Sequence, residues 1–559
     1  MRAPGAMVGL NDAQVGLLLC VLSSGCATFK HEPGLAKCGP DAEPCLAAPY
    51  AETAWSTAHA TSRNDDYVPV ELPRRYALSW TALEGFSTLM SPSIGPEGHV
   101  YITTPSGPGT STLHAFDADG RKLWESDAWQ GPEGLDSCSG FQTPVVDRQG
   151  DIYLSDCNQI WSFSSAGKVR WVVDLPRPPE GAAWQNARAA PVNPLVTAIL
   201  TRDGAVGGMS IWGDIVLVSR TDGSRVSAVA KMPGSVAIGD NELPKGLGIE
   251  PPPGVWQGGF MDPEMIPVVW YLFEGVLPSA NTPAVHSETG RIFATGLSRA
   301  LDDDRGALYG FDFVPGSKGR LGHVEVGLEF VMGPGSGSSP AISPNGSTVY
   351  VSDGEGVLYA VDSATGHANW SLRTGGQQAS PSIGANGMIY LLGGKAGFAI
   401  HPDGTKAWAA NLDALAEARL PPLHPGSLLF GPSTFHNAVP TITDSGVLTS
   451  ITVGYLAALG AQSVIPLPVA QLVVLLDPKT GALIESFSPL RLRDTVEGFV
   501  ATARDGAIYA NQGALVSTTL QALAPHFAPL LPDGVALMAP VGGLQVFQPV
   551  RPDDVQLDP

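Results

Sequence analysis

The chain has 559 residues and a formal net charge of −21 at pH 7, with 15% charged and 44% hydrophobic residues. A charge of this size repels phosphate backbones and anionic lipid headgroups, which argues against nucleic acid as a partner, while the apolar content is ample for a folded core. The chain contains 66 Gly and 49 Pro residues, which is typical of a turn-rich folded protein rather than of low-complexity disorder.

Residues 1–26 have the pattern of a signal peptide. Arg2 precedes a short apolar run over residues 15–22, and Ser-Ser-Gly leads directly to Cys26. The apolar run is too short to span a bilayer as a stable helix. A cysteine after small residues resembles the lipobox of bacterial lipoproteins, in which this cysteine carries acyl chains that hold the protein on the membrane. Ser23 and Asp12 depart from that pattern, so plain secretion is the alternative to lipid attachment at Cys26.

Residues 27–74 are small, polar and without periodicity, and we expect them to form a flexible tether. Residues 551–559 form a C-terminal tail. In an oxidising compartment, the short sequence separations favour disulfides between Cys38 and Cys45 and between Cys138 and Cys157. Four cysteines allow three pairings, and the sequence leaves the other two open.

From Ser91 onward the sequence repeats itself. Each clear copy has Ser-Pro or Thr-Pro, then a Val-Tyr or Ile-Tyr segment, then a second apolar alternation, a Gly and a Trp. The clear copies begin at Ser91, Thr143, Ser339 and Ser380, and weaker copies begin near Ala190, Thr282, Pro440 and Phe499. Repetition at this period predicts small units that must stack to bury their faces.

Each copy reads as a four-stranded antiparallel sheet. Pro lies where a strand starts, the alternating segments have the period of a half-buried strand, and the Gly-containing steps are hairpin turns. The recurring tryptophans are expected to pack between neighbouring sheets, and they are Trp80, Trp124, Trp171, Trp370 and Trp408. Tyr76–Thr81 resembles an outer strand that lacks its own sheet, and we expect it to complete the last copy. The prediction is an all-β, eight-bladed propeller over residues 75–550, with seven blades as the alternative.

These motifs resemble the quinoprotein-type repeat. That repeat occurs in pyrroloquinoline-quinone (PQQ) alcohol dehydrogenases and in the lipoprotein of the outer-membrane β-barrel assembly machinery. The resemblance runs from about Tyr76 to Val550. It implies either a quinone cofactor with Ca²⁺ or a non-catalytic binding role. The dehydrogenases use a vicinal disulfide, and no two cysteines are adjacent here.

Insertions interrupt the repeat at three places: Gly234–Asn281, Asp413–Val439 and Gly454–Ala470. Loops carried by a rigid scaffold are the usual place for binding residues. The first insertion is rich in aromatic residues and is our candidate partner-binding loop, with Trp256, Phe260, Trp270, Tyr271 and Phe273. Residues 446–476 carry no charge, which fits a repeat with an inserted loop better than a membrane span because Pro466 and Pro468 interrupt it.

Catalytic and metal motifs are weak. Asp302, Asp303 and Asp304 are a candidate for Ca²⁺, with a solvated turn as the simpler interpretation. Asp117, Asp362 and Asp477 recur at equivalent positions, which indicates turn capping rather than an active site. The histidines form no HExxH grouping. We therefore expect no catalytic residue, no resident metal and no cofactor.

The sequence favours a non-catalytic propeller that acts as a scaffold for another envelope protein or peptide. The predicted location is the cell envelope, as a periplasm-facing or surface lipoprotein of the outer membrane. A PQQ-dependent envelope oxidoreductase is the first alternative, and a carbohydrate- or polymer-binding module is the second. A small-molecule substrate is not expected.

Overall fold

The computed structural model describes residues 49–104 except 87 and 89, 112–127, 142–176, 193–234, 279–299 except 280, 305–375 except 318 and 336, 379–435 except 394, 439–459, 463–487, 500–511, 527–537 and 542–550. Within these residues the chain forms eight sheets: seven have four antiparallel strands, and one has six strands that are antiparallel except for one parallel pair. The eight-bladed propeller predicted from the repeats is confirmed, and regular helix is nearly absent from the described residues.

In each blade four strands follow one another from the centre of the ring to its rim, and they are given in that order. Blade 1 has β3 (Ser93–Ile94), β4 (Val100–Thr103), β5 (Leu113–Phe116) and β6 (Lys122–Glu125); blade 2 has β7 (Val145–Val146), β8 (Ile152–Ser155), β9 (Gln159–Phe163) and β10 (Val169–Asp174). Blade 3 has β11 (Ile199–Leu200), β12 (Ala205–Met209), β13 (Asp214–Ser219) and β14 (Ala230–Lys231); blade 4 has β15 (Ala284–Val285), β16 (Ile292–Leu297), β17 (Arg305–Val314) and β18 (His323–Pro334).

The remaining blades follow the same order. Blade 5 has β19 (Ala341–Ile342), β20 (Thr348–Ser352), β21 (Val357–Asp362) and β22 (Ala368–Arg373); blade 6 has β23 (Ser382–Ile383), β24 (Ile389–Gly393), β25 (Ala396–Ile400) and β26 (Lys406–Asn411). Blade 7 has β28 (Thr441–Thr443), β29 (Val447–Leu459), β30 (Ser463–Leu476) and β31 (Leu483–Phe487), and blade 8 has β32 (Val500–Thr502), β33 (Ile508–Asn511) and β34 (Leu544–Pro549).

Blade 5 shows why the repeat folds this way. Pro340 lies directly before the inner strand β19, where its missing N–H is not needed. Gly356 and Gly366 adopt φ values of 76° in the two following hairpin turns, a conformation that a side chain disfavours. Asp362 accepts hydrogen bonds from the N–H groups of Ala364 and Thr365, at 3.1 and 2.8 Å. Asp117 and Asp477 cap equivalent turns in the same way.

Among the described residues, eight buried apolar clusters hold neighbouring blades together. Each cluster draws residues from two consecutive blades, and the last cluster joins blade 8 to blade 1. At that junction Val546 and Tyr509 of blade 8 share a cluster with Ile102 and Phe116 of blade 1. The blades therefore close into a complete ring.

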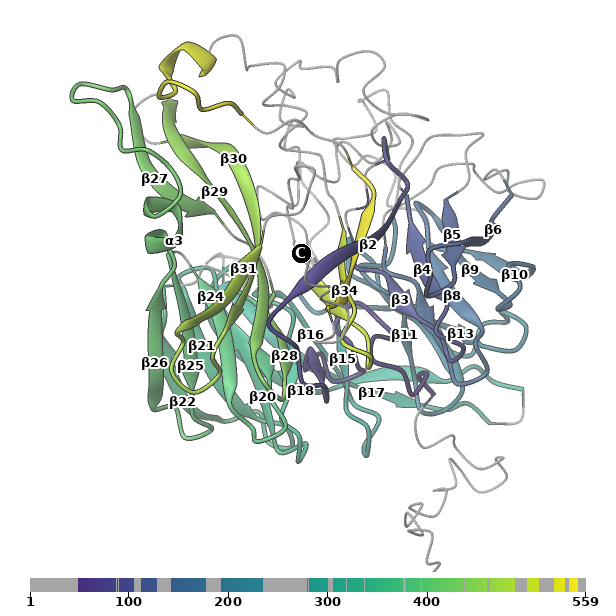
Figure 1. The fold of residues 1–559 in the computed structure, drawn as a ribbon. Helices are drawn as coiled ribbons and strands as arrows, with labels where there is room; N and C mark the ends of the chain where they lie inside the picture. Colours follow the sequence, from purple (N-terminus) through teal and green to yellow (C-terminus); the bar gives the residue numbers. More distant parts are fainter. Residues whose placement is uncertain are drawn as a thin grey trace, which may run out of the picture. The chain divides into compact units, whose positions relative to one another are not determined.

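An N-terminal strand closes this ring. The strand β2 (Tyr76–Ala82) pairs antiparallel with β34, with Tyr76 opposite Pro549 and Ala82 opposite Leu544. Figure 1 shows the two strands, purple and yellow, side by side. Blade 8 thus takes its outer strand from the opposite end of the described chain, as the sequence predicted. This pairing leaves blade 8 without an open edge at that strand.

Blade 7 is larger than the sequence indicated. Two of the expected loop insertions contain regular structure: α3 (Asp413–Glu417) and β27 (Leu429–Phe435) lie within 413–439, and 454–470 lengthens the β29–β30 hairpin instead of splitting it. The strand β27 pairs with residues 452–457 of β29. We call β27 and the parts of β29 and β30 beside it the arm, and Figure 1 shows this arm projecting beyond the blade. Apolar residues cover the arm, including Leu420 and Leu530, the latter in the short 3-10 turn η2 (Ala528–Leu530).

The apolar residues that cover the arm explain why it can lack charge.

No helix among the described residues has the length and apolar character needed to cross a membrane. The uncharged stretch 446–476 is accounted for by the buried face of a long hairpin, with Ile451, Val453 and Leu467 fully buried.

Candidate functional site

Residues 49–72, which we call the channel segment, lie along the axis of the ring. In seven blades the amide of the second inner-strand residue donates a hydrogen bond to this segment. The pairs are Ile94 to Trp55 O, Val146 to Ser56 O, Val285 to Ser62 O, Ile342 to Arg63 O, Ile383 to Asp65 O, Ile442 to Asp66 O, and Leu200 to the Tyr50 hydroxyl, at 2.6 to 2.9 Å. A segment bonded to the innermost strands of seven blades must occupy the centre of the propeller.

The eighth blade contacts the same segment through apolar packing. Trp55 and Val68 share a cluster with Ala501 and Tyr509 of blade 8. A short strand within the segment, β1 (Tyr67–Val68), also adds in parallel to the inner edge of β28. Trp55 and Val68 are fully buried. The channel segment is therefore buried within the ring.

The hydroxyl groups of the Ser-Pro and Thr-Pro motifs surround this segment. The Ser91 hydroxyl donates to Ala58 O at 3.3 Å and lies 3.3 Å from the Thr143 hydroxyl of the next blade. The Ser339 and Ser380 hydroxyls accept hydrogen bonds from the N–H groups of Thr282 and Ser339, at 3.1 and 3.2 Å. The repeated hydroxyl therefore links each of these blades to the next around the channel.

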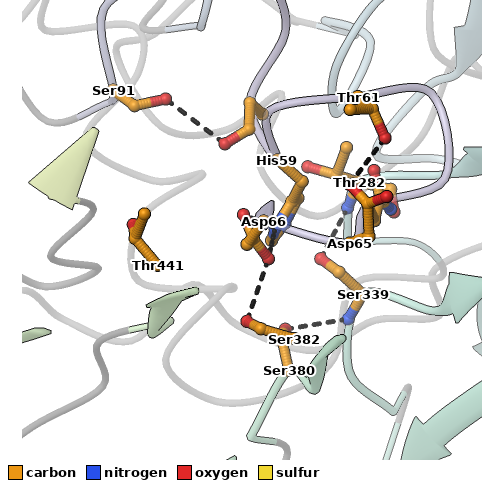
Figure 2. A network of polar contacts seen from close by, with 12 residues as sticks. His59, Thr61, Asp65, Asp66, Ser91, Thr282, Ser339, Ser380, Ser382 and Thr441 are labelled. Carbon is orange, nitrogen blue, oxygen red and sulfur yellow. Dashed lines mark hydrogen bonds and ion pairs between the residues drawn. The ribbon is translucent and has the colours of Figure 1, made fainter. Parts of the chain in front are cut away.

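A buried contact between a histidine and an aspartate lies within the segment. His59 Nδ1 is 3.0 Å from Asp66 Oδ2, and both side chains are almost fully buried. Figure 2 shows the Ser382 hydroxyl of blade 6 directed at the same carboxylate, to which it donates at 3.1 Å. Burial raises the pKa of Asp66, and the neighbouring His59 opposes this rise. Ser382 contacts Asp66 rather than His59, so the three residues do not have the order of a catalytic triad.

Three residues of the segment have unusual backbone conformations. Ala60, Asn64 and Asp66 have φ values of 60°, 55° and 50°. Residues other than glycine rarely adopt this left-handed region because the Cβ approaches the backbone carbonyl. Such strain persists where the surroundings hold it, and here the amides of the blades do so.

The structure differs from the expected tether over 27–74. Residues 49–72 lie in the ring and are largely buried, while residues 27–48 are outside the described part of the chain. The contacts run mainly through backbone carbonyls, which leave no periodic side-chain pattern in the sequence. The fully buried Trp55 and the adjacent acidic pair Asp65–Asp66 are the only local signals.

The recurring tryptophans lie between blades. The indole N–H of each donates to a carbonyl in a turn of the following blade: Trp80 to Ala118, Trp124 to Ser165, Trp171 to Arg220, Trp370 to Pro402 and Trp408 to Pro478, at 2.9 to 3.1 Å. The ring also covers the glycine of that turn. A Cβ built on Gly167 would lie 2.6 Å from Trp124 Cδ2, so the indole fits only because the turn lacks a side chain.

Several predicted site residues lie outside the described part of the chain. They are Cys26, Cys38, Cys45 and Cys138, the aromatic residues Trp256, Phe260, Trp270, Tyr271 and Phe273, and Asp302, Asp303 and Asp304. Cys157 is described and is disulfide-bonded, and its partner is not among the described residues.

The described residues do not fit a quinone held with Ca²⁺ in the channel. No group of three or more His, Cys, Asp or Glu side chains within them is arranged to hold a metal ion. The two buried carboxylates of the channel segment are already engaged: Asp66 with His59 and Ser382, and Asp65 with Thr61 and Arg63. A calcium ion needs several oxygen ligands that are free to coordinate it.

A cavity of about 560 Å³ lies between blades 6 and 7 and is lined by Tyr67, Tyr390, His401, Asp444 and Lys479, among others. Tyr67 donates to Asp444. Burial and this carboxylate raise the pKa of Tyr67 to about 12. Its hydroxyl therefore stays protonated at neutral pH and is not poised as a base.

A family model for the outer membrane protein assembly factor BamB, built on PQQ-type repeats, matches residues 299–486. Within residues 299–486 the repeats match this type. This match includes the complete blades 5 and 6 and confirms the resemblance recognised in the sequence. A search of curated proteins found no match.

Solved structures share the propeller fold at low sequence identity. The quinohemoprotein alcohol dehydrogenase from Comamonas testosteroni is 11% identical, with a TM-score of 0.50 over 89% of this chain and 81% of that one. A europium-containing methanol dehydrogenase is 11% identical, with a TM-score of 0.51 over 89% and 98%. BamB from Moraxella catarrhalis is 12% identical, with a TM-score of 0.40 over 86% and 99%. The two dehydrogenases support the fold and nothing beyond it.

Proposed function

We propose that this chain is a non-catalytic propeller of the cell envelope that binds another protein at the rim of its blades. One observation carries the proposal: the channel segment fills the axis of the ring and satisfies the inner edge of seven blades. The accessible backbone groups of the ring are then those of the outer strands. An extended segment of a partner can add to such an edge through main-chain hydrogen bonds.

The arm of blade 7 is a poor edge for strand addition. Pro432 lies within β27 and has no N–H, and the Thr434 amide already donates to the Asp413 carboxylate at 2.8 Å. On the other side, Pro466 and Pro468 interrupt the part of β30 that extends beyond β31. Prolines and covered amides are the usual protection of an exposed edge.

The outer strand of blade 4 is a better edge for strand addition. With 12 residues, β18 is the longest outer strand among the described residues, and its outer edge pairs with no strand there. It exposes Val326 and Val331, at 38% and 44% of their surface. The net charge of −21 favours a partner segment with basic residues. We propose an extended basic segment of an envelope protein as the occupant of this edge.

The test is affinity capture from the native envelope with the tagged full chain and a double variant, V326K/V331K. Lysine on an edge strand opposes strand addition, so we expect the variant to retain at least about tenfold less of a stoichiometric partner. V169K is the matched control, because Val169 is a 52% exposed valine on the outer strand β10 of blade 2. Equal capture by all three proteins would contradict the proposal.

Parallel samples receive quinone and Ca²⁺ and are assayed for dye reduction. We expect no turnover above that of buffer, and quinone-dependent turnover without a captured partner would favour the oxidoreductase alternative. Depletion by insoluble polysaccharide would favour the carbohydrate-binding alternative.

We also propose lipid attachment at Cys26 and a location in the outer membrane facing the periplasm or the surface. Mass spectrometry of the N-terminal peptide and fractionation of C26S test this part. We expect an acylated peptide from the native chain and loss of membrane association in the variant.

A further inference from the structure

We infer that the central channel is a peptide-binding site whose ligand is this chain's own residues 49–72. The site consists of one repeated feature, the amide of the second inner-strand residue, which seven blades direct at the segment. Ordinarily the inner edge of a propeller blade is an unpaired edge. Here the seven donors require a ligand that presents backbone carbonyls and one tyrosine hydroxyl outward.

Side chains of the segment add specificity to this backbone recognition. The Asn64 amide donates to Thr282 O and Pro340 O at 2.9 and 3.0 Å, and so bridges blades 4 and 5. The Trp55 indole N–H donates to the Ser91 hydroxyl at 3.3 Å, and its ring is fully buried between blades. Asp66 accepts from Ser382. The preferred ligand is therefore a peptide with an aromatic residue, an amide and a carboxylate at these spacings.

The chain joins this ligand to the ring through a short exposed connection. Arg74 and Arg75 follow the segment and are exposed, and β2 begins at Tyr76. The Val550 N–H donates to Arg75 O at 3.0 Å, which fixes the ring side of the connection. A cut between Arg74 and Arg75 would separate the ligand from the ring while leaving β2 on blade 8.

The experiment inserts a specific protease site between Arg74 and Arg75 of the full chain. After cleavage we expect the N-terminal fragment to elute with the ring in size-exclusion chromatography, because its bonds to seven blades remain. An excess of fluorescent peptide 49–73 should then exchange into the cleaved complex, measured by anisotropy. The uncut chain is the control and should take up no peptide.

Peptide variants test the specificity. Replacing Trp55, Asn64 or Asp66 by Ala should lower uptake at least about tenfold, a loss of about 1.4 kcal/mol in binding. E52A is the matched control and should exchange close to normally, since the Glu52 side chain is 72% exposed and its ion pair with Arg148 lies at the surface, where such pairs contribute little. After cleavage, the V326K/V331K chain should also take up the peptide normally. Peptide uptake is therefore independent of the proposed function of the rim.

Three results would overturn the inference. The first is release of the N-terminal fragment from the ring on cleavage, with the β-sheet circular dichroism unchanged. The second is equal uptake of a scrambled peptide and of peptide 49–73. The third is exchange that occurs only with loss of the ring's circular dichroism, which would make residues 49–72 an inseparable part of the core rather than a ligand.

Discussion

The contact between a tryptophan and a turn glycine of the next blade gives a prediction with a matched control. Gly167 has a φ of 80°, and a Cβ there would lie 2.6 and 2.7 Å from Trp124 atoms. Gly98 has a φ of 77° and no atom within 4 Å of its Cβ position. G98A should therefore cost about 1 kcal/mol of unfolding free energy, from left-handed strain offset by reduced freedom of the unfolded chain. G167A should cost about 2–4 kcal/mol, because displacing a packed indole adds about 1–3 kcal/mol.

Urea denaturation midpoints at equal slope measure both costs. The double variant G167A/W124L should cost less than the sum of its single variants, because a smaller side chain removes the clash. Equal costs for G98A and G167A would refute the reasoning, since only the second glycine faces a tryptophan.

Other predictions concern the channel segment. A60G should cost about 1–2 kcal/mol less unfolding free energy than A58G. Both alanines are fully buried and lose a methyl group, but only Ala60 has a φ of 60°, which glycine adopts without strain; urea midpoints decide the comparison. W55A should cost about 3–5 kcal/mol in the same assay, and a cost below about 1 kcal/mol would contradict burial of this ring. Burial raises the folded-state pKa of Asp66 above its unfolded value. This carboxyl therefore favours folding at low pH and loses that contribution as pH rises from the unfolded pKa of about 3.9 through the higher folded pKa. D66N should remove this fall in stability with rising pH, and an unchanged profile would contradict the reasoning.

The repeat was predictable because each copy contains the residues that specify its strands and turns. Ser-Pro, the Tyr-containing alternation, the turn Gly and the Trp occur in one order, and stacking of such units is the only way to bury both faces. The role of Tyr76–Thr81 also followed from pattern, since this segment resembles an outer strand and the last copy lacks one.

The channel segment was not predictable in the same way. Its partners are the backbone amides of seven blades, and a carbonyl acceptor is present at every residue. Ala60 adopts a left-handed conformation that favours Gly, so the sequence gives no turn signal at this position. The position of the segment depends on the assembled ring, which no local window of sequence contains.

The arm of blade 7 shows a second limit. Residues 454–470 lack charge and contain Pro466 and Pro468, which favoured a loop. The hairpin is nevertheless continuous, because both prolines lie beyond β31, where β30 needs no donor on its outer edge.

Hydrogen–deuterium exchange of the inner-strand amides tests the account most directly. If the channel segment occupies the axis, the amides of Ile94, Ile342 and Ile442 should exchange as slowly as those in the middle strands of their blades. The outer edge of β18, which pairs with no strand among the described residues, provides the fast reference. Exchange of the three inner amides at the rate of that reference would show an open channel and contradict the account.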